Sequence, residues 1–438
     1  MSEAKNQTKT IKVNYLARVE GEGGLFIKAQ NGKVKDVQLR IFEPPRFFEG
    51  LLVDRAFTEA PDITARICGI CPVAYQMSAC QAMENACGIT VDGPLRDLRR
   101  LLYCGEWIKS HVLHIYMLHA PDFLGYEGVV QMAKDFPQEV ERGLRLKKVG
   151  NDLMSLVGGR DIHPINVCLG GFYKTPTFRE LLEFADKLKQ AHEDAIKTLE
   201  WLSTFRYPQL ERGYLFVSLC HPHEYPIDRG KVISSAGLNI DVSQFENFFF
   251  EKHLPHSTAL HATHIDADKK ERDYLVGPMA RFNLNFNCLT PTAKYYAEQL
   301  GLTPPCTNPF KSIAIRAIEV LYAIEEALRL IDSYHAPFSS KMPITPKANN
   351  GYGCTEAPRG ILYHRYEIDE QGIIKVAKIV PPTSQNQKII EEDLRHFVER
   401  YFSQGQAVLQ HHCEQAIRNY DPCISCATHF LKLHIDEE

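Results

Sequence analysis

The sequence predicts an α+β protein in which a bundle of long helices forms the core and β-hairpins lie at its periphery. Three segments repeat apolar residues at near-helical spacing, and two pairs of extended segments flank short turns. The chain has 438 residues, 44% of them hydrophobic, which is enough to bury a sizeable core. We expect an N-terminal hairpin region at about 10–60, a helical core at about 90–345 and a second hairpin at about 361–380.

The first hairpin is predicted around Asn31-Gly32. Residues 25–30 and 34–39 flank this pair. Both central residues of a type I′ turn need a positive φ angle, which asparagine and glycine tolerate. The second hairpin is predicted to pair residues 361–368 with residues 373–380.

The long helices are predicted at residues 94–119, 177–204 and 313–334. Thr175-Pro176-Thr177 supplies a start signal for the second of them. Such apolar stripes are explained by packing in a helical bundle. The three histidines near the end of the first segment are interpreted as core or interface residues. The stretch 207–305 has no clear period, so we expect a loop-rich insertion with short strands there.

Composition excludes several classes of function. The net charge of −4 gives no reason to expect nucleic acid or an anionic membrane as a partner. No run of about 18 apolar residues suggests a membrane span, and the N-terminus lacks the apolar core of a signal peptide. The 13 cysteines are odd in number and lack compact disulfide spacing, which predicts a reducing, cytoplasmic location.

Two C-x-x-C pairs at opposite ends of the chain carry the strongest chemical signal. The first is Cys68 with Cys71, and the second is Cys423 with Cys426, after a helix predicted at roughly 405–418. Either pair alone also fits a redox motif or a zinc or iron–sulfur site. Thiolates favour soft or borderline transition metals. Because most of the chain separates the pairs, they suggest a metal centre buried in the middle of a large fold.

The two motifs, R-x-C-G-x-C at 66–71 and D-P-C-x-x-C-x-x-H at 421–429, resemble the signature of the [NiFe]-hydrogenase large subunit. The resemblance begins at Arg18-Val19-Glu20-Gly21 and is closest to the cytoplasmic, multi-subunit, NAD(P)-linked group. It implies a catalytic subunit that cleaves H2 heterolytically and reversibly. One departure is Tyr75, which stands where many members carry a histidine. The family's hydrogen bonds around Cys71 therefore do not transfer in detail.

The resemblance implies a nickel–iron centre whose iron carries one carbon monoxide and two cyanides. By motif position, Cys68 and Cys423 would be terminal ligands of nickel. Cys71 and Cys426 would bridge nickel to iron.

The resemblance also implies a Mg²⁺ site and a proton path. Glu49, in R-F-F-E-G, and His429 would bind Mg²⁺, which prefers oxygen ligands. Glu20 would relay protons from the thiolate of Cys423. Arg359, in E-A-P-R-G, would lie above the open side of the metals, as a base or a stabiliser of charge. From composition alone, Glu20 is simply an exposed loop carboxylate and Glu49 a solvated side chain at the start of a surface helix.

Further residues are expected around the centre. Arg66 would offset the negative charge of the ligands, or pair with a carboxylate. Asp122 matches a family aspartate that pairs with an arginine over the active site, and Asp421 is another partner open to the arginine of E-A-P-R-G. Thr383 would donate a hydrogen bond to a cyanide, or cap a helix that begins near Lys388.

The chain has no spare cysteine cluster with ferredoxin-like spacing, so we expect no iron–sulfur cluster within it. Electrons would pass to an iron–sulfur small subunit, which residues 158–171 would help to contact. Flavin-containing diaphorase subunits would then reduce NADP or NAD. The resemblance also implies nickel-insertion chaperones and a maturation endopeptidase that removes residues 430–438. A single catalytic domain, 1–429, would remain.

Two other classes stay open. One is a structural zinc- or iron–sulfur-binding subunit of a redox complex without hydrogenase activity, which leaves Glu49 and Arg359 unexplained. Bound zinc or sulfide without nickel would support it. The other is the cysteine-free relative in respiratory complex I, and the presence of all four motif cysteines argues against it.

Overall fold

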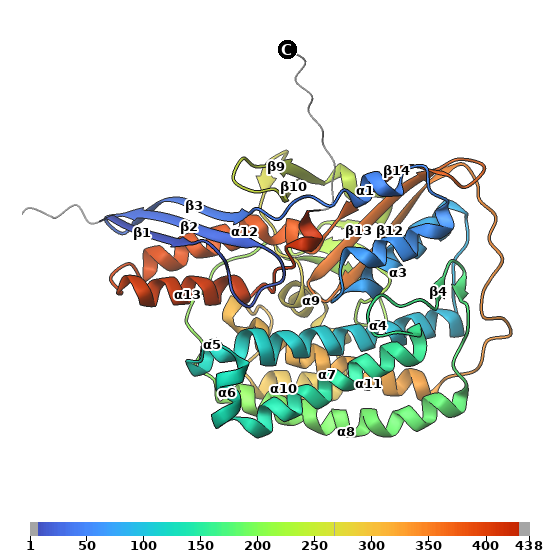
Figure 1. Ribbon diagram of the computed structural model, residues 1–438, viewed down its shortest axis with the longest axis horizontal. Coiled ribbons are helices and arrows are strands. Elements are labelled where there is room, and N and C mark those ends of the chain that lie inside the picture. The colour runs from blue at the N-terminus through green and yellow to red at the C-terminus, as the bar shows by residue number, and fades with distance from the viewer. Residues whose placement is uncertain (1–7, 267, 429–438) are drawn as a thin grey trace, which may run out of the picture.

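Four long helices lie side by side in the computed structural model, which describes residues 8–266 and 268–428 (Figure 1). They are α4 (Pro94–Leu113), α7 (Pro137–Gly158), α8 (Phe178–Ser203) and α11 (Ser312–Asp332). Helix α4 packs against α7 and α11, and α8 packs against the same two helices. The helical core and its three predicted helices are confirmed. Thr177 caps α8 and forms a capping box with Glu180, as its start signal predicted.

Helix α7 was missed by the sequence analysis because glycines occupy part of its buried face. A Cβ atom at Gly150 would lie 2.7 Å from the backbone nitrogen of Lys109 and 2.8 Å from the carbonyl oxygen of Gly105. The two helices therefore approach backbone to backbone, and the glycines on this face interrupt the apolar periodicity of α7. After α4 the chain continues through a π-helical turn, η3 (His114–His119), and two short helices, α5 (Ala120–Leu124) and α6 (Val129–Asp135).

The N-terminal sheet is antiparallel, with β1 (Thr8–Val13), β2 (Gly23–Gln30) and β3 (Lys33–Ile41) in that order. Gln30 pairs with Lys33 across the predicted turn, where Asn31 and Gly32 have φ angles of 51° and 77°. The first hairpin is therefore confirmed, together with the reason for its turn. Helices α12 (Pro382–Arg400) and α13 (Gln406–Arg418) extend beside this sheet, and α12 packs on β3 (Figure 1).

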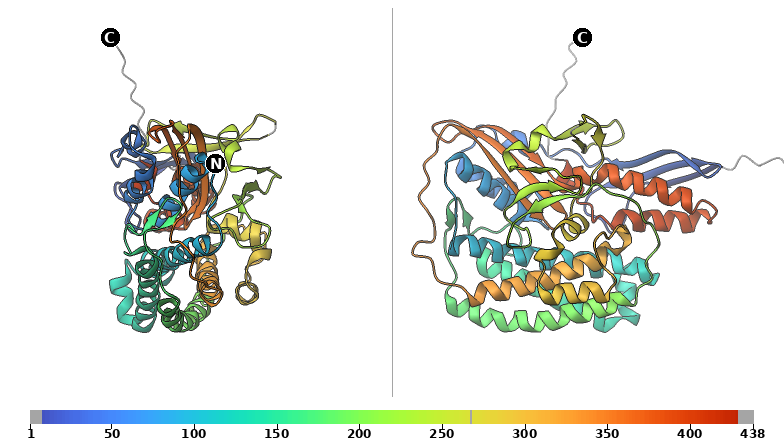
Figure 2. Two further views of the ribbon diagram at one scale, coloured as in Figure 1. Left: turned by 90° about the vertical axis from the view of Figure 1, so that its right-hand side faces the viewer. Right: turned by 180° about the vertical axis from the view of Figure 1, so that it is seen from behind.

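The second sheet contains β12 (Asn349–Ala357), β13 (Gly360–Ile368) and β14 (Ile374–Val380). The predicted hairpin is the β13–β14 pair, and β12 adds a third strand. Helix α3 (Pro72–Ala86) lies directly on β12, since a Cβ atom at Gly353 would lie 2.2 Å from the carbonyl oxygen of Ser78. In the side view of Figure 2 the sheets form a layer distinct from the helical bundle.

The stretch 207–305 forms two small antiparallel sheets and two helices. The sheets consist of β6 (Val217–Cys220), β7 (Lys231–Ser234) and β8 (Asn239–Ile240), and of β9 (Phe249–His253), β10 (Leu260–Ile265) and β11 (Glu271–Arg272). The expectation of short strands is met, but α9 (Pro278–Asn285) and α10 (Pro291–Gln299) were not foreseen.

The remaining elements are short. They are α1 (Phe48–Leu52), η1 (Phe57–Glu59), α2 (Ala60–Thr64), η2 (Ala65–Ile67), β4 (Val167–Cys168), β5 (Gly171–Phe172), η4 (Val242–Asn247), η5 (Phe286–Cys288), η6 (Pro309–Lys311) and η7 (Ser425–Ala427). Within the described part of the chain, no helix is both long and apolar enough to cross a membrane.

Candidate metal centre

Four cysteines from the two ends of the chain meet at one point. Cys68 follows η2, Cys71 immediately precedes α3, and Cys423 and Cys426 lie just before and within η7. Their four Sγ atoms lie within 4.8 Å of one another, and all four side chains are buried. The Sγ–Sγ distance is 3.5 Å between Cys68 and Cys423 and 3.9 Å between Cys71 and Cys426. The expected convergence of the two motifs is therefore present.

The chemistry of this donor set fits a soft transition-metal centre. Burial raises the pKa of the thiols of Cys423 and Cys426 well above its usual range. Hydrogen bonds from neighbouring thiols, that of Cys423 first, hold the pKa of Cys68 well below it. A soft cation would ionise all four thiols and remove the cost of burying several negative charges together.

Glu20 lies beside the second cysteine pair. Its Oε2 atom is 3.1 Å from Cys423 Sγ and accepts a hydrogen bond of 3.1 Å from the backbone N–H of Ser425. Its carbonyl oxygen accepts from the N–H of Ile424 at 3.0 Å. Gly21, with φ of +87°, allows this contact because a Cβ atom there would lie 2.7 Å from Ile424 Cβ. Glu20 is half-buried, not a freely exposed loop carboxylate.

Arg359 is buried at the turn between β12 and β13. Its Nε donates to the carbonyl oxygen of Asp421 at 2.6 Å, and its Nη2 donates to Asp421 Oδ1 at 3.1 Å. Its Nη1 is buried without a hydrogen-bond partner among the described residues. Burial opposes the charge, but the carboxylate of Asp421 and the nearby thiols outweigh it and raise the pKa of Arg359 well above its usual range. The positively charged guanidinium of Arg359 therefore lies next to the cysteines with one unused hydrogen-bond donor.

Asp122 does not pair with Arg359, so that alternative is wrong. Its carboxylate accepts two hydrogen bonds from Arg418, at 2.7 and 2.9 Å, and one from Arg18 at 2.5 Å. These two arginines tie α5 to α13 and to the segment before Glu20. Sequence analysis missed Arg418. Arg18 lies in the motif around Glu20, but a role for it was not predicted.

The structure tests the helix-cap interpretation of Thr383 and shows that Arg66 is exposed. Thr383 lies in the first turn of α12, which begins at Pro382 and not near Lys388, so the capping alternative is wrong. Its buried Oγ1 accepts a hydrogen bond of 3.0 Å from the backbone N–H of Cys423. Arg66 is exposed and acts electrostatically on the carboxyl of Asp62. The expectation that Arg66 offsets the charge of the thiolates stays a prediction, while its action on Asp62 agrees with the alternative of a carboxylate partner.

Glu49 lies in α1, and its Oε1 accepts a hydrogen bond of 2.8 Å from the backbone N–H of Ile379. His429, its predicted partner in Mg²⁺ binding, lies outside the described residues. Thr428, the residue before His429, lies close to the segment that leads into α1, since the N–H of Arg46 donates to the carbonyl oxygen of Thr428 at 2.6 Å.

Two buried polar residues beside Cys71 complete the surroundings. The hydroxyl of Tyr75 has no hydrogen-bond partner of ordinary geometry among the described residues, and burial raises its pKa, with a smaller contribution from the thiol of Cys426. Glu106 accepts the backbone N–H groups of Val73 and Ala74, at 2.6 and 3.1 Å, and burial raises its pKa to about 8. Sequence analysis missed Glu106, whose one signal is a carboxylate on the apolar face of α4.

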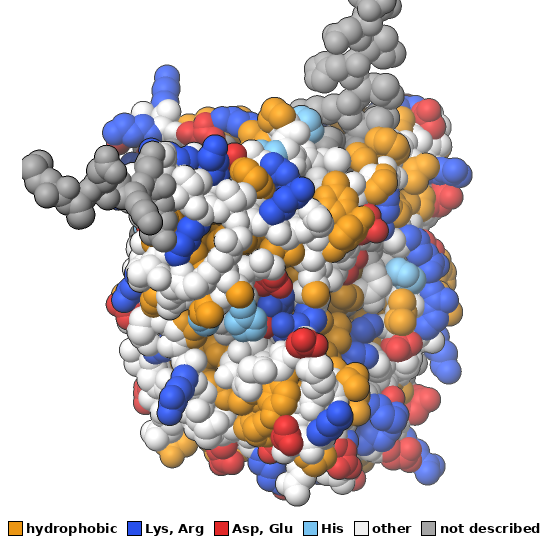
Figure 3. Space-filling model, turned by 60° about the vertical axis from the view of Figure 1, so that its left-hand side comes forward, with side chains coloured by type: hydrophobic (Ala, Val, Ile, Leu, Met, Phe, Trp, Pro, Cys, Tyr) orange, Lys and Arg blue, Asp and Glu red, His pale blue; other side chains and the backbone are white. Residues whose placement is uncertain are grey.

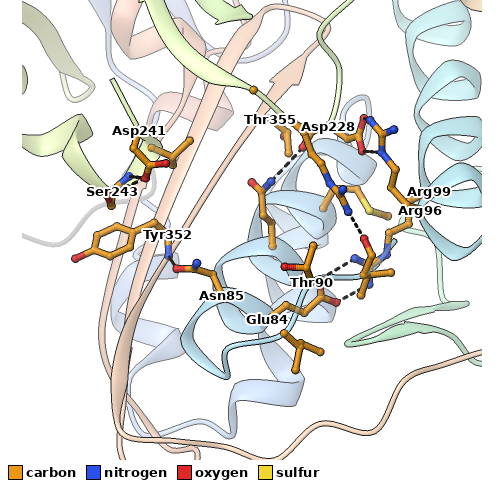
Figure 4. A pocket seen from close by; sticks show the side chains of 17 residues that line it. Glu84, Asn85, Thr90, Arg96, Arg99, Asp228, Asp241, Ser243, Tyr352 and Thr355 are labelled. Atoms are coloured by element: carbon orange, nitrogen blue, oxygen red, sulfur yellow. Dashed lines mark hydrogen bonds and ion pairs between the residues drawn. The ribbon is translucent and has the colours of Figure 1, made fainter. Parts of the chain in front are cut away.

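A pocket of about 330 Å³ lies elsewhere, at the far end of α3 (Figure 4). Its charged side chains already have partners. Arg96 pairs with Asp228 at 2.9 Å, and Arg99 pairs with Glu84 at 2.6 Å. The pocket therefore offers little unbalanced charge to a ligand.

The fold and the buried four-thiol cluster define a metalloprotein with a soft-metal centre. The profile of the nickel-dependent hydrogenase family matches residues 46–142 and 290–429. Sulfhydrogenase 1 subunit alpha from Pyrococcus furiosus is 34% identical over 437 residues, which cover 98% of this chain and 100% of that protein. The NAD-reducing hydrogenase HoxS subunit beta from Cupriavidus necator is 26% identical, over 97% of this chain and 95% of its own length.

The chain therefore belongs to the nickel-dependent hydrogenase family, as a large subunit, and it is an oxidoreductase that acts on H2. The crystal structure of an NAD⁺-reducing [NiFe]-hydrogenase in the H2-reduced state has the same fold. Its TM-score is 0.86 at 24% identity, over 97% of this chain and 100% of that one. The resemblance inferred from the cysteine motifs is confirmed, and both alternative classes lose their support.

Proposed function

We propose that this chain is the catalytic subunit of a [NiFe]-hydrogenase in which Cys68, Cys71, Cys423 and Cys426 hold nickel and iron. The observation that carries the proposal is the buried cluster of four Sγ atoms within 4.8 Å, in a member of this family. When bound, the nickel–iron centre supplies the site at which H2 is split heterolytically. One carbon monoxide and two cyanides on iron complete the proposed cofactor.

The chain's own residues would manage protons and charge. Glu20 Oε2 lies within direct transfer distance of Cys423 Sγ, 3.1 Å, and Glu20 is half-buried, so it can pass a proton from the thiol toward solvent. Arg359 keeps a positive charge beside the thiolates and has one donor left for a further anionic group or for substrate. Thr383 fixes the backbone of Cys423 by accepting its N–H, and a hydroxyl that accepts in this way can still donate its own proton.

We propose that Glu49 and His429 bind Mg²⁺. The hydrogen bond between Arg46 and Thr428 supports this, because it holds the chain immediately before His429 at the start of α1. We also propose that a maturation endopeptidase removes residues 430–438, after chaperones insert nickel, which leaves one catalytic domain at 1–429. An intact mass of the active subunit equal to the full-length chain would contradict this step.

The electron partners are proposed to be an iron–sulfur small subunit and flavin-containing diaphorase subunits that reduce NADP or NAD. The name of the HoxS relative supports an NAD-linked acceptor. Ile162, which lies next to the exposed Gly69, and Ile165 are 46% and 53% exposed, which suits a partner's surface. Hydrophobic patches also interrupt the charged and polar face in Figure 3. None of the 13 cysteines, all of which lie in the described part of the chain, forms a disulfide, which supports a cytoplasmic location.

Infrared spectroscopy of the purified complex, with nickel and iron analysis of the same sample, tests this function. Bands of iron-bound carbon monoxide and cyanide are expected with equal nickel and iron in this subunit. Glu20→Gln should keep those bands but lower H2 oxidation by about 10²–10⁴-fold, the usual contribution of a positioned proton-transfer group. Glu22→Gln, at an exposed carboxylate two residues away, should change neither. No bands, no nickel and zinc at the cysteines would overturn the proposal.

A further inference from the structure

A second group of metal-ligating side chains converges away from the cysteines. Among the described residues, His256, His261 and Glu391 offer one ligand atom each, all within 4.8 Å of one another. His256 lies in the loop between β9 and β10, His261 lies on β10, and Glu391 lies in the middle of α12. Three separate elements therefore contribute to one cluster.

The geometry of the cluster suits a small cation. His256 Nε2 and Glu391 Oε1 are 2.9 Å apart, and the two imidazole rings are 5.7 Å apart and nearly perpendicular. Tetrahedral zinc with ligand bonds of about 2.0–2.1 Å places neighbouring ligand atoms about 3.3 Å apart. His256 and Glu391 are thus close to this spacing, and the ligand atom of His261, within 4.8 Å of both, would move closer when a metal ion replaces the proton that they share. Glu391 Oε1 is held in place by the backbone N–H of Leu39, at 2.9 Å.

His261 is an independent sign that something is bound there. Its side chain is only 3% exposed, and neither ring nitrogen has a hydrogen-bond partner of ordinary geometry among the described residues. Buried polar groups are normally paired. The amide nitrogen of Gln387 donates to the carbonyl oxygen of Leu260, at 3.0 Å, and the side chain of Gln387 acts only weakly on the pKa of His261, in which burial is the largest effect. Burial lowers the pKa of His261 to about 3, so its imidazole is neutral, the form that binds metals.

We propose that His256, His261 and Glu391 bind one divalent transition-metal ion of the zinc class, at a site separate from the four-cysteine centre. Two imidazoles and a carboxylate are a ligand set that zinc uses with a water in the fourth position. His256, whose side chain is 20% exposed, provides the side from which ion and water enter.

The site acts as a clip between the β9–β10 hairpin and α12. Helix α12 also carries Thr383, which holds the backbone of Cys423. Eight residues, about 12 Å along a helix, separate Thr383 from Glu391. The ion is therefore too far away to take part in H2 chemistry, and it fixes the helix that supports one of the cysteine pairs. This inference does not depend on the proposed function.

Zinc binding to the purified complex tests the proposal directly. The complex is treated with a mild chelator, equilibrated with Zn²⁺ and measured by metal analysis and zinc K-edge X-ray absorption. One retained zinc per chain is expected, with nitrogen and oxygen ligands at about 2.0–2.1 Å. Sulfur ligands at about 2.3 Å would place the zinc on cysteines and overturn the proposal. Absence of retained zinc would overturn it as well.

Matched variants assign the zinc to these residues. Glu391→Gln keeps an acceptor for the N–H of Leu39, and His256→Gln changes a half-buried loop residue, so both should still assemble. Each should weaken zinc binding by more than the roughly 10–100-fold that loss of an outer partner costs. His253→Gln, at an exposed histidine three positions before His256, is the control and should bind zinc normally. Equal zinc affinity in all three variants would refute the assignment.

Discussion

Replacing Gly353 with alanine should disturb the metal centre from a distance, through helix α3. A Cβ atom at Gly353 would lie 2.2 Å from the carbonyl oxygen of Ser78, whereas real Cβ contacts stay beyond 3.0 Å. Strand and helix must therefore separate by at least about 0.8 Å, and both contact atoms are backbone or Cβ, so no side chain can yield. Overpacking of this kind costs about 1–3 kcal/mol.

The consequence for metal binding follows from the position of Cys71, which immediately precedes α3. Metal–thiolate distances tolerate deviations of only about 0.2 Å, so a displaced Cys71 should hold metal poorly. Thermal unfolding and the nickel content of the purified complex are the measurements, and both should fall. Gly213→Ala is the control, because a Cβ atom there meets nothing within 4 Å. Unchanged nickel content and stability in Gly353→Ala would refute the reasoning.

Three further variants probe the surroundings of the cysteines. Thr383→Val leaves the buried N–H of Cys423 unpaired, which should cost about 1–3 kcal/mol of unfolding free energy in a denaturant titration, whereas Thr383→Ser should not. Arg359→Lys keeps the charge but not both contacts to Asp421, so H2 oxidation should fall by about 10²–10³-fold with nickel content retained. Tyr75→Phe removes a hydroxyl that has no hydrogen-bond partner of ordinary geometry among the described residues, so stability should change by less than about 1 kcal/mol. A shift of the infrared bands in that variant would show that the hydroxyl contacts the loaded centre, and unchanged bands would show that it does not.

Local signals in the sequence predicted most of the fold. The Asn31-Gly32 turn and the apolar stripes of α4, α8 and α11 are properties of neighbouring residues, so they could be read directly. Helix α7 and strand β12 could not, because glycines such as Gly150 and Gly353 stand where their backbones touch another element. Glycine lowers helix and strand propensity alike, so close packing concealed both elements from a pattern search.

The same distinction between local and long-range signals applies to the candidate site. The cysteine motifs fix their own neighbours, and the contact between Glu20 and Cys423 has the geometry that the family resemblance implied. Ion pairs between residues far apart in the sequence could not be predicted from local motifs. Asp122 pairs with Arg418, 296 positions away, and not with Arg359.

The contacts around the cysteines explain why the two ends of the chain must meet before the site exists. The thiol of Cys423 lies beside Glu20, and its backbone N–H donates to Thr383. The carbonyl oxygen of the nearby Asp421 accepts a hydrogen bond from Arg359. Residues from the N-terminal third of the chain and from two C-terminal elements therefore hold Cys423 in place. No single segment carries a preformed metal site. Three of the four thiols, those of Cys71, Cys423 and Cys426, have a raised pKa and resist ionisation without a cation, so the folded arrangement and the bound metal stabilise each other. Metal loading is therefore expected to be coupled to the docking of the C-terminal cysteine pair onto the rest of the fold.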